Sequence, residues 1–177
     1  MNTITYRTMK PSELIKIKEI DRSEYIHEIY VFENNVLVLK PDHCIVNSFD
    51  TEELEAMIEK QHHILEGQGT VIGAFEMDKL IGVASVENKK RGINADYSKM
   101  DILYVSNKYR GKKIGHSLIE ACKDVATTFG TNKLYISATP TKATVDFYLR
   151  EGAILTKEID SELFKLEPLD IHLELQF

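Results

Sequence analysis

The chain contains little cysteine and no long apolar run. Cys44 and Cys122 are its only two cysteines, and their separation fits neither a metal-binding spacing nor a secreted disulfide framework. Cys122 falls on the apolar positions of a helical pattern and is expected to be a buried small hydrophobe. No stretch approaches the ~18 apolar residues of a membrane span. The opening MNTITYRTMK lacks the apolar core of a signal peptide. These absences predict a cytoplasmic protein with no membrane association.

An excess of positive charge is also missing. Lys and Arg number 22 against 28 Asp and Glu, so the formal net charge is −6. Because a surface that binds nucleic acid has to be basic, this balance argues against a nucleic-acid partner. No repeat, low-complexity segment or linker rich in Pro, Gly or Ser interrupts the 177 residues. This length is ample for one hydrophobic core, and we expect a single domain over residues 1–177.

Apolar patterning in the first half of the chain predicts both strands and helices. Residues 4–8 alternate as in a strand, and PSELIKIKEI then reads as a helical stretch. The segment EIYVFENNVLVLK has the form of a β-hairpin, since Asn34-Asn35 tolerates the positive φ of a tight turn. A helix is expected to begin after the cap at Asp50 and to end at Gly67.

The second half predicts a β–α–β core with further strands around it. The strands TVIGAFEM and KLIGVASVE precede one at 100–106, a helix over 114–129 and the strand KLYISAT. TKATVDFYLREG is expected to be a helix, and AILTKEI, LFKLE and DIHLELQF to be the last strands. Together these patterns predict a mixed α/β domain around a central sheet, with antiparallel hairpins before and after the core.

A glycine-containing loop, residues 107–113, joins the strand at 100–106 to the helix that follows. Such a loop directs backbone N–H groups to a point where the helix dipole is positive, and this arrangement binds phosphate. Arg110, Lys112 and Lys113 add positive charge there. The Gly-Lys-Ser/Thr ending of a nucleotide P-loop is absent, and the dinucleotide fingerprint Gly-x-Gly-x-x-Gly does not fit either.

Two motifs together resemble the GCN5-related N-acetyltransferase (GNAT) family. The acyl-CoA loop of that family reads Arg/Gln-x-x-Gly-x-Gly/Ala after Leu-x-Val, and here LYV at 103–105 precedes RGKKIG at 110–115. The second signature, Ala-x-x-x-Phe-Tyr-x-x-x-Gly-Phe, is similar to ATVDFYLREGA, with Ala143, Phe147, Tyr148 and Gly152 in register. The resemblance is specific over residues 70–156. It implies a central, mostly antiparallel twisted sheet flanked by helices, with the hairpin inserted near the acceptor side.

Two positions depart from the family pattern. Lys113 replaces the first glycine of the loop motif, where the family mainly needs a backbone N–H close to the pyrophosphate. A lysine with negative φ can donate that N–H, and its ammonium adds a charge contact. Pro140 stands where many members carry asparagine and cannot donate from its nitrogen. The usual asparagine would hold the pantetheine or a water molecule. We expect Thr139 or Thr141 to take over this contact, or the contact to be absent.

The resemblance implies acetyl-CoA as co-substrate and no metal. The pantetheine would lie against Leu103 to Val105, in a gap between strands 100–106 and 134–138, and a backbone N–H, taken to be that of Tyr104, would polarise the thioester carbonyl. Tyr148 would be the general acid, because a phenol with a pKa of about 10 is protonated at neutral pH. The alternative for Tyr148 is simple core packing. The expected cofactor-binding residues are Leu103, Tyr104, Val105, Arg110, Gly111, Lys112, Lys113, Ile114, Gly115, His116, Ser117, Phe147 and Tyr148.

The sequence leaves the general base and the acceptor wall open. Glu87 and Asp101 stand at strand ends near the expected site, and a water relay is an equal alternative. The segment IDRSEYIHEIY carries acidic and aromatic groups that suit an ammonium, although an exposed acidic surface is the simpler interpretation. The residues concerned are Asp21, Glu24, Tyr25, Glu28 and Tyr30.

The leading interpretation is an N-acetyltransferase that acts on a small primary amine, such as an amine toxin or antibiotic. The amine would attack directly in a ternary complex, so no nucleophilic Cys or Ser is required. Acetylation of a protein N-terminus or lysine is one alternative, and a non-catalytic acyl-CoA-binding regulatory module is another. The oligomeric state is not fixed, although the C-terminal strand DIHLELQF is a candidate for pairing with a second subunit as a homodimer.

Overall fold

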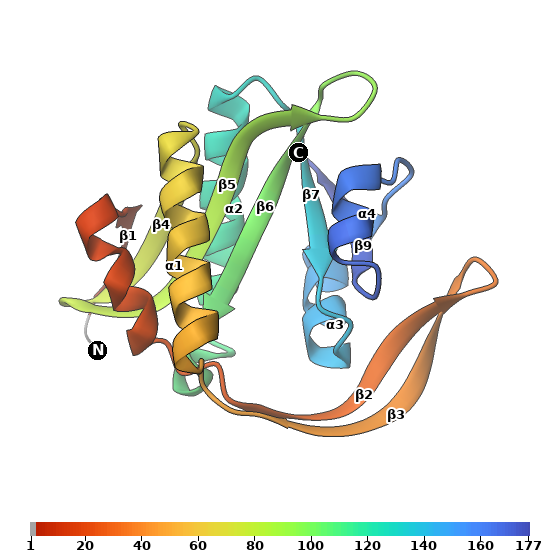
Figure 1. Ribbon diagram of the computed structural model, residues 1–177, viewed down its shortest axis with the longest axis horizontal. Coiled ribbons are helices and arrows are strands. Elements are labelled where there is room, and N and C mark those ends of the chain that lie inside the picture. Colours follow the sequence, from red (N-terminus) through yellow and green to blue (C-terminus); the bar gives the residue numbers. More distant parts are fainter. Residues whose placement is uncertain (1–2) are drawn as a thin grey trace.

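The computed structural model describes residues 3–177, in which a twisted seven-stranded sheet carries helices on both faces (Figure 1). The strand order is β1-β4-β5-β6-β7-β9-β8, and every neighbouring pair is antiparallel except β6 and β7. The predicted fold class, a mixed α/β domain with a mostly antiparallel sheet, is confirmed. The strands are β1 (Ile4–Thr8), β4 (Thr70–Glu76), β5 (Lys79–Arg91), β6 (Tyr97–Val105), β7 (Lys133–Ala138), β8 (Ile154–Leu155) and β9 (Ile171–Gln176).

Helices cover the two faces of the sheet with separate cores. On one face, α2 (Ile114–Thr128) and α3 (Lys142–Arg150) pack on a cluster that includes Leu118, Val145 and Leu173. On the other, the 3₁₀-helix η1 (Pro11–Glu19) and α1 (Thr51–Glu66) cover Phe75 and Val83. The stretch PSELIKIKEI is therefore helical, as predicted, but with 3₁₀ geometry. Asp50 caps α1 as expected, because its side chain accepts a hydrogen bond from the Glu53 N–H.

The last third of the chain departs from the predicted strands. LFKLE was expected to be a strand but lies mostly within the helix α4 (Ser161–Leu166), because the Asp160 carboxylate caps the N–H groups of Glu162 and Leu163. Only Ile154–Leu155 of AILTKEI forms a strand. The C-terminal strand β9 lies between β7 and β8, so it is not a free edge for pairing with a second subunit.

The predicted hairpin is longer than the sequence indicated and leaves the body of the molecule as an arm. Its strands β2 (Glu24–Glu33) and β3 (Val36–Val46) form a separate two-stranded sheet. Asn34 and Asn35 have φ values of 51° and 65°, so the turn is of the predicted kind. The arm crosses below the ends of β6 and β7 and passes α3 (Figure 1).

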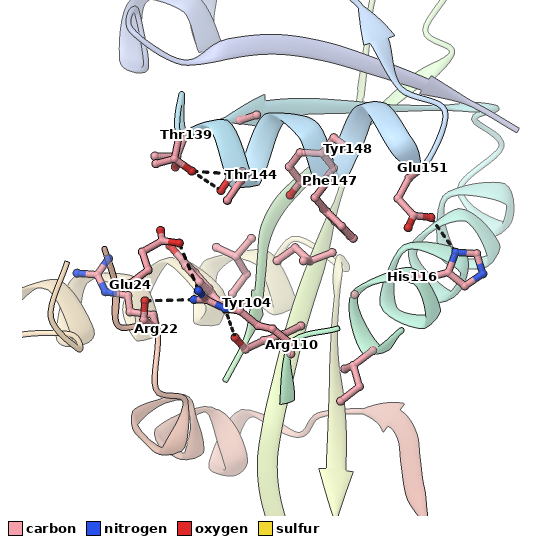
Figure 2. A pocket seen from close by; sticks show the side chains of 18 of the residues that line it. Arg22, Glu24, Tyr104, Arg110, His116, Thr139, Thr144, Phe147, Tyr148 and Glu151 are labelled. Carbon is pink, nitrogen blue, oxygen red and sulfur yellow. Dashed lines mark hydrogen bonds and ion pairs between the residues drawn. The ribbon is translucent and has the colours of Figure 1, made fainter. Parts of the chain in front are cut away.

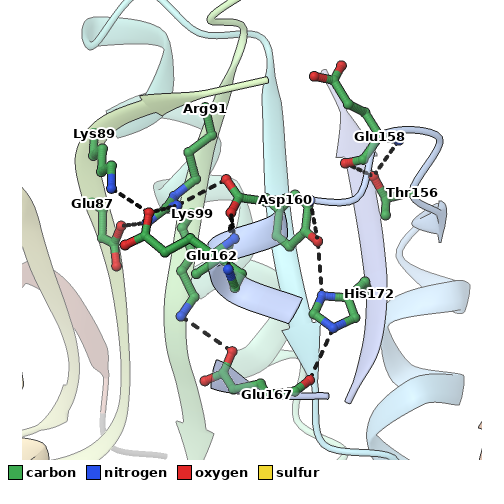
Figure 3. A network of polar contacts seen from close by, with 12 residues as sticks. Glu87, Lys89, Arg91, Lys99, Thr156, Glu158, Asp160, Glu162, Glu167 and His172 are labelled. Atoms are coloured by element: carbon green, nitrogen blue, oxygen red, sulfur yellow. Dashed lines mark hydrogen bonds and ion pairs between the residues drawn. The ribbon is translucent and has the colours of Figure 1, made fainter. Parts of the chain in front are cut away.

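A network of buried ion pairs fastens α4 to the sheet (Figure 3). The Arg91 side chain, only 5% exposed, pairs with Glu87 at 2.9 Å, with Asp160 at 3.0 Å and with Glu162 at 3.2 Å. Lys99, also buried, lies 3.6 Å from Glu167 at the end of α4. Since a lone buried charge is costly, removing any one partner destabilises the others. These long-range pairs hold α4 on β5 and β6, where no local pattern would put it.

We expect Asp170→Asn to stabilise the protein at neutral pH. Burial, and then the nearby Glu167 carboxylate, raise the pKa of Asp170 from its usual value near 3.8 to about 6. The folded chain retains this proton where the unfolded chain releases it, so the associated stability is present below pH 4 and is lost as the pH rises through about 6. The variant should gain about 1–2 kcal/mol at pH 7.5, after allowance for partial exposure, and little at pH 4.

Thermal unfolding of both proteins at the two pH values measures this difference. Asp124→Asn, which removes an exposed carboxylate from α2, is the matched control. A gain of equal size at pH 4 and pH 7.5 would show that the ionisation of Asp170 is not its source.

Candidate active site

The site begins where β6 and β7 part. Their parallel pairing runs only from Tyr97 with Lys133 to Met100 with Ile136, although β6 continues to Val105 and β7 to Ala138. The strands diverge beyond this point, as the resemblance implied (Figure 1). The facing backbone groups there have no ladder partner on the other strand. An open pair of edges of this kind is suited to an extended ligand that adds itself as a strand.

A pocket of about 720 Å³ occupies this gap (Figure 2). It is lined by β6, the loop after it, the first turn of α2, the end of β7, α3 and the root of the arm. Of the predicted cofactor-binding residues, all except Lys112 and Ser117 are among its lining: Leu103, Tyr104, Val105, Arg110, Gly111, Lys113, Ile114, Gly115, His116, Phe147 and Tyr148.

A bulge in β6 shapes the wall of the pocket. Ala84 and Val86 on β5 pair with Leu103 and Met100, so β6 contains one extra residue at positions 101–102. Downstream the ladder is regular, and the Ser106 N–H donates to the Ile81 carbonyl on β5 at 2.9 Å. By alternation the N–H of residue 104 also faces β5, while those of residues 103 and 105 face the gap. The geometry therefore favours these two N–H groups over that of residue 104.

The loop before α2 has the backbone form of an anion site. Gly111 and Lys113 have φ values of +76° and +62°, and Lys113 is the N-cap of α2. Left-handed residues between right-handed ones gather successive N–H groups into a concave nest, and the first N–H groups of α2 lack intrahelical acceptors. From the sequence, Lys113 was assumed to have a negative φ, and this assumption is wrong. Lysine here occupies a glycine-like conformation that strains an L-residue.

Packing between the two motifs holds this loop against α3. A Cβ on Gly115 would come within 2.9 Å of the Phe147 ring, so only glycine allows the present contact between α2 and α3. Lys112 lies outside the lining because its ammonium sits over the Tyr109 ring, 4.9 Å from the centroid. His116 reaches across to α3, where its Nδ1 is 2.7 Å from the Glu151 carboxylate (Figure 2).

Arg110 makes contacts that the motif did not predict. Its Nε donates to the Val105 carbonyl, its Nη1 to the Glu24 carboxylate and its Nη2 to the Arg22 carbonyl, each at 3.3 Å. Two of these acceptors belong to the segment that enters the arm. Figure 2 shows the guanidinium lying between them. In this structure Arg110 hydrogen-bonds to other parts of the protein, and its binding of a cofactor stays a prediction.

Tyr148 lies in the pocket wall with its side chain 6% exposed. Burial, followed by its neighbours Cys122 and Tyr104, raises the pKa of the Tyr148 phenol well above its usual range. Within residues 3–177 its hydroxyl makes no hydrogen bond, so it is available to a ligand. A neutral phenol facing the gap can donate a proton, which is the capacity a general acid needs.

Neither carboxylate considered as the general base is favoured. Glu87 is held by Arg91 and does not line the pocket. Asp101 lines the pocket, but its carboxylate is fully buried between Lys60 at 2.7 Å and Lys99 at 3.0 Å. Burial acts to raise the pKa of Asp101, but the two lysines outweigh it and hold that pKa below its usual value. A carboxylate stabilised in this way is a weak base, and the base remains unassigned.

The predicted acidic wall is divided. Glu24 lines the main pocket, and together with Tyr25 and Glu28 it lines an adjoining pocket of about 360 Å³ between β2 and α3. Tyr30 donates its hydroxyl to Asp146 at 2.8 Å, and Asp21 lines neither space. In the described part of the chain, no cluster of three or more His, Cys, Asp or Glu side chains is placed to hold a metal.

Sequence reasoning missed several lining residues that lie outside the two motifs or at variable positions of the second motif. They are Arg22, Ile26, Val46, Ser137, Thr144, Arg150 and Glu151. The Ser137 hydroxyl is buried and unpaired among the described residues. Thr139 and Thr141, considered as substitutes for the usual asparagine, both line the pocket. The Thr141 hydroxyl caps α3 by accepting from the Thr144 N–H at 3.2 Å, which leaves Thr139 for a ligand.

Comparison with known proteins shows the family to which the chain belongs. A profile described as "Acetyltransferase (GNAT) domain" matches residues 38–160, more than half of the chain. The protein therefore belongs to the GNAT family of acetyltransferases. Members of this family use acetyl-CoA as co-substrate. No curated protein sequence matches the chain, and no helix within residues 3–177 is long and apolar enough to cross a membrane.

Solved structures show the same fold at low sequence identity. Nourseothricin acetyltransferase aligns with a TM-score of 0.72 and 18% identity, covering 98% of each chain. A second structure is a protein from Bacillus anthracis strain Ames, assigned as a streptothricin acetyltransferase and solved with acetyl coenzyme A. It aligns with a TM-score of 0.68 and 18% identity, covering 99% of this chain and 98% of its own. PaiA N-acetyltransferase from Thermoplasma acidophilum, with coenzyme A, aligns at 0.62 and 17% over 99% of both.

We expect Lys113→Gly to stabilise the fold. The left-handed conformation costs an L-residue about 1–2 kcal/mol, of which glycine's greater freedom in the unfolded chain cancels about 0.5–1 kcal/mol. Urea unfolding should therefore show a net gain of about 0.5–1 kcal/mol in the free energy of unfolding. Lys112→Gly, one residue earlier and without a positive φ, is the matched control and should lose stability. A loss in both variants would mean that Lys113 is not strained.

Proposed function

We propose that this acetyltransferase transfers the acetyl group of acetyl-CoA to a primary amine of a small molecule. The observation that carries the proposal is the continuity of the pocket. One space of about 720 Å³ joins the anion-binding loop at α2 to the root of the arm. A cofactor held by the loop and an acceptor held beside the arm can therefore meet between β6 and β7, as direct transfer requires.

The loop and the open strand edge fit the parts of the cofactor. The N–H groups gathered by Gly111, Lys113 and the start of α2 suit a pyrophosphate, and the Lys113 ammonium adds charge. The unpaired edge of β6 suits the amides of a pantetheine arm, with the N–H of Leu103 or Val105 polarising the reacting carbonyl. When bound, acetyl-CoA supplies an activated acetyl group to this point.

Neither cysteine of the chain offers a nucleophile to the pocket. Cys122 is fully buried, which raises its pKa to about 12, and Cys44 stands exposed on the arm away from the lining. A thiol with so high a pKa does not form the reactive thiolate. In the proposed reaction the neutral amine attacks the thioester carbonyl directly, and the C–S bond breaks as Tyr148 gives its phenolic proton to the sulfur. The proton that the new amide nitrogen loses to water replaces the one given by Tyr148. Because the Tyr148 hydroxyl has no hydrogen-bond partner among residues 3–177, this proton transfer breaks no contact in the described part of the chain.

The arm favours a small acceptor over a protein. It crosses the open end of the gap and makes a second, smaller pocket against α3, so the acceptor side is a confined, half-open pocket rather than a long groove. Tyr25 and Glu28 offer this pocket an aromatic ring and a carboxylate that suit an ammonium. Its lining also carries Lys142, which is paired with Asp146, and Arg150. Since similar structures bear the names of nourseothricin and streptothricin acetyltransferases, an amine-bearing antibiotic of that class is our first acceptor to test. A single domain and a cytoplasmic location stay predictions.

We expect calorimetric titration to show one acetyl-CoA bound per chain, and Tyr148→Phe to retain that affinity while transferring at least about tenfold more slowly. The variant keeps the ring and removes only the proton donor. Transfer is followed by release of the coenzyme A thiol with a panel of amines. Tyr135→Phe, which removes a buried hydroxyl bonded to His172 outside the pocket, is the matched control and should transfer normally.

Three outcomes separate the alternatives. Normal transfer by Tyr148→Phe would remove Tyr148 from the mechanism and leave the acetyltransferase intact. Tight acetyl-CoA binding without transfer to any amine or peptide would favour the non-catalytic acyl-CoA-binding module. Transfer to peptide N-termini or lysines in preference to small amines would establish the protein-acetylating alternative.

A further inference from the structure

Several hydrogen bonds join the root of the arm, residues 21–24, to the cofactor loop, residues 106–113. The Asn107 N–H donates to the Asp21 carbonyl at 2.8 Å, and the Asn107 side-chain amide donates to the Ser23 carbonyl at 2.8 Å. The Asp21 N–H in turn donates to the Ser106 hydroxyl at 3.1 Å. These residues are more than 80 positions apart in the chain. The loop and the arm root therefore form one hydrogen-bonded unit.

Arg110 completes this unit on the pocket side. Its guanidinium is divided among the Val105 carbonyl, the Arg22 carbonyl and the Glu24 carboxylate (Figure 2). The Arg110 and Glu24 side chains are 41% and 24% exposed, so their ion pair is only partly screened by water. A guanidinium is a planar fork that fixes the groups it bridges. Here it joins the end of β6, at Val105, to Arg22 and Glu24 at the start of the arm.

A second attachment ties the arm to the other side of the gap. The Tyr30 N–H donates to the Pro140 carbonyl at 2.7 Å, and Ile29 forms a single bridge with Thr141. Pro140, which departs from the family pattern, thus serves as an acceptor for the arm. The arm is joined to β6 through the loop and to β7 and α3 through Pro140. Because a lone two-stranded hairpin is marginally stable in water, these attachments decide where it lies.

We propose that Arg110 is a positioning residue that holds the arm on the cofactor loop, so that a ligand on the loop also orders the acceptor side. The loop's backbone N–H groups and Lys113 are left to bind the cofactor's phosphates, and this part rests on the proposed function. Ordering of the loop passes through Arg110 and Glu24 to β2, which lines the acceptor enclosure. By linkage, whatever orders the arm must also strengthen binding at the loop.

Hydrogen exchange of the ligand-free protein tests the attachment directly. In Arg110→Gln and in Glu24→Gln, the amides of residues 22–28 should exchange up to about fivefold faster, the most that a partly exposed ion pair accounts for. The double variant should be no faster than Arg110→Gln alone, since Glu24 acts through Arg110. Lys108→Gln is the matched control, because it removes a cation from the same loop that contacts only the Tyr109 ring. Unchanged exchange in Arg110→Gln overturns the proposal.

Saturating coenzyme A then tests the coupling without any knowledge of the acceptor. Coenzyme A should slow exchange in residues 22–28 of the original protein and of Lys108→Gln, but not of Arg110→Gln at equal occupancy. Arm protection that persists in Arg110→Gln contradicts the coupling. A loss of coenzyme A affinity of tenfold or more in Arg110→Gln but not in Glu24→Gln would assign Arg110 to the phosphates instead. If the original protein binds no coenzyme A, the proposed function fails, while the ligand-free exchange still decides the role of Arg110.

Discussion

The parting of β6 and β7 is the constraint on which the rest of the structure depends. Their ladder ends after Met100 and Ile136, so two strands run on into the interior with unpaired backbone groups on their facing edges. Buried N–H and C=O groups need partners, and the protein supplies them only in part. The loop, the arm and the start of α3 are gathered around this opening, and the remaining edge is left to a ligand. The bulge at 101–102 increases the divergence on the β6 side.

The close contact between α2 and α3 explains why two motifs far apart in the sequence work as one site. Gly115 belongs to the loop motif and Phe147 to the second motif, and they touch because glycine has no Cβ. This contact sets the distance between the anion-binding loop and Tyr148. On the acceptor side, the start of β2 and the end of β3 line the pocket together with β6 and α3. Neither the cofactor side nor the acceptor side is therefore built by one element alone.

Sequence patterns predicted what local rules determine and failed where distant residues decide. The strand, loop and helix around residues 100–129 follow from apolar periodicity and from glycine, and the structure reproduces them within a few residues. LFKLE was misassigned because its alternation resembles a strand. It forms a helix because Asp160 caps the Leu163 N–H and is itself held by an ion pair with Arg91. The partners of Arg110 were unpredictable for the same reason, since Glu24 lies 86 residues away. The conformation of Lys113 was missed because its side chain gives no sign of a positive φ.

The ion pairs of the other cations in the pocket indicate which kind of ligand Lys113 favours. Among the described residues that line the pocket, Arg22 pairs with Glu53, Arg110 with Glu24 and His116 with Glu151, while Lys113 and Arg150 make no ion pair. A glycine at 113 would relieve the strain, but among the described residues of the loop that line the pocket it would leave only Arg110 as a cation, which is already paired with Glu24. An ammonium at the N-cap of α2 adds its charge to the helix dipole where that dipole is positive. This charge favours an anion over a cationic group at that position, which supports the proposed placement of the cofactor's phosphates at the loop.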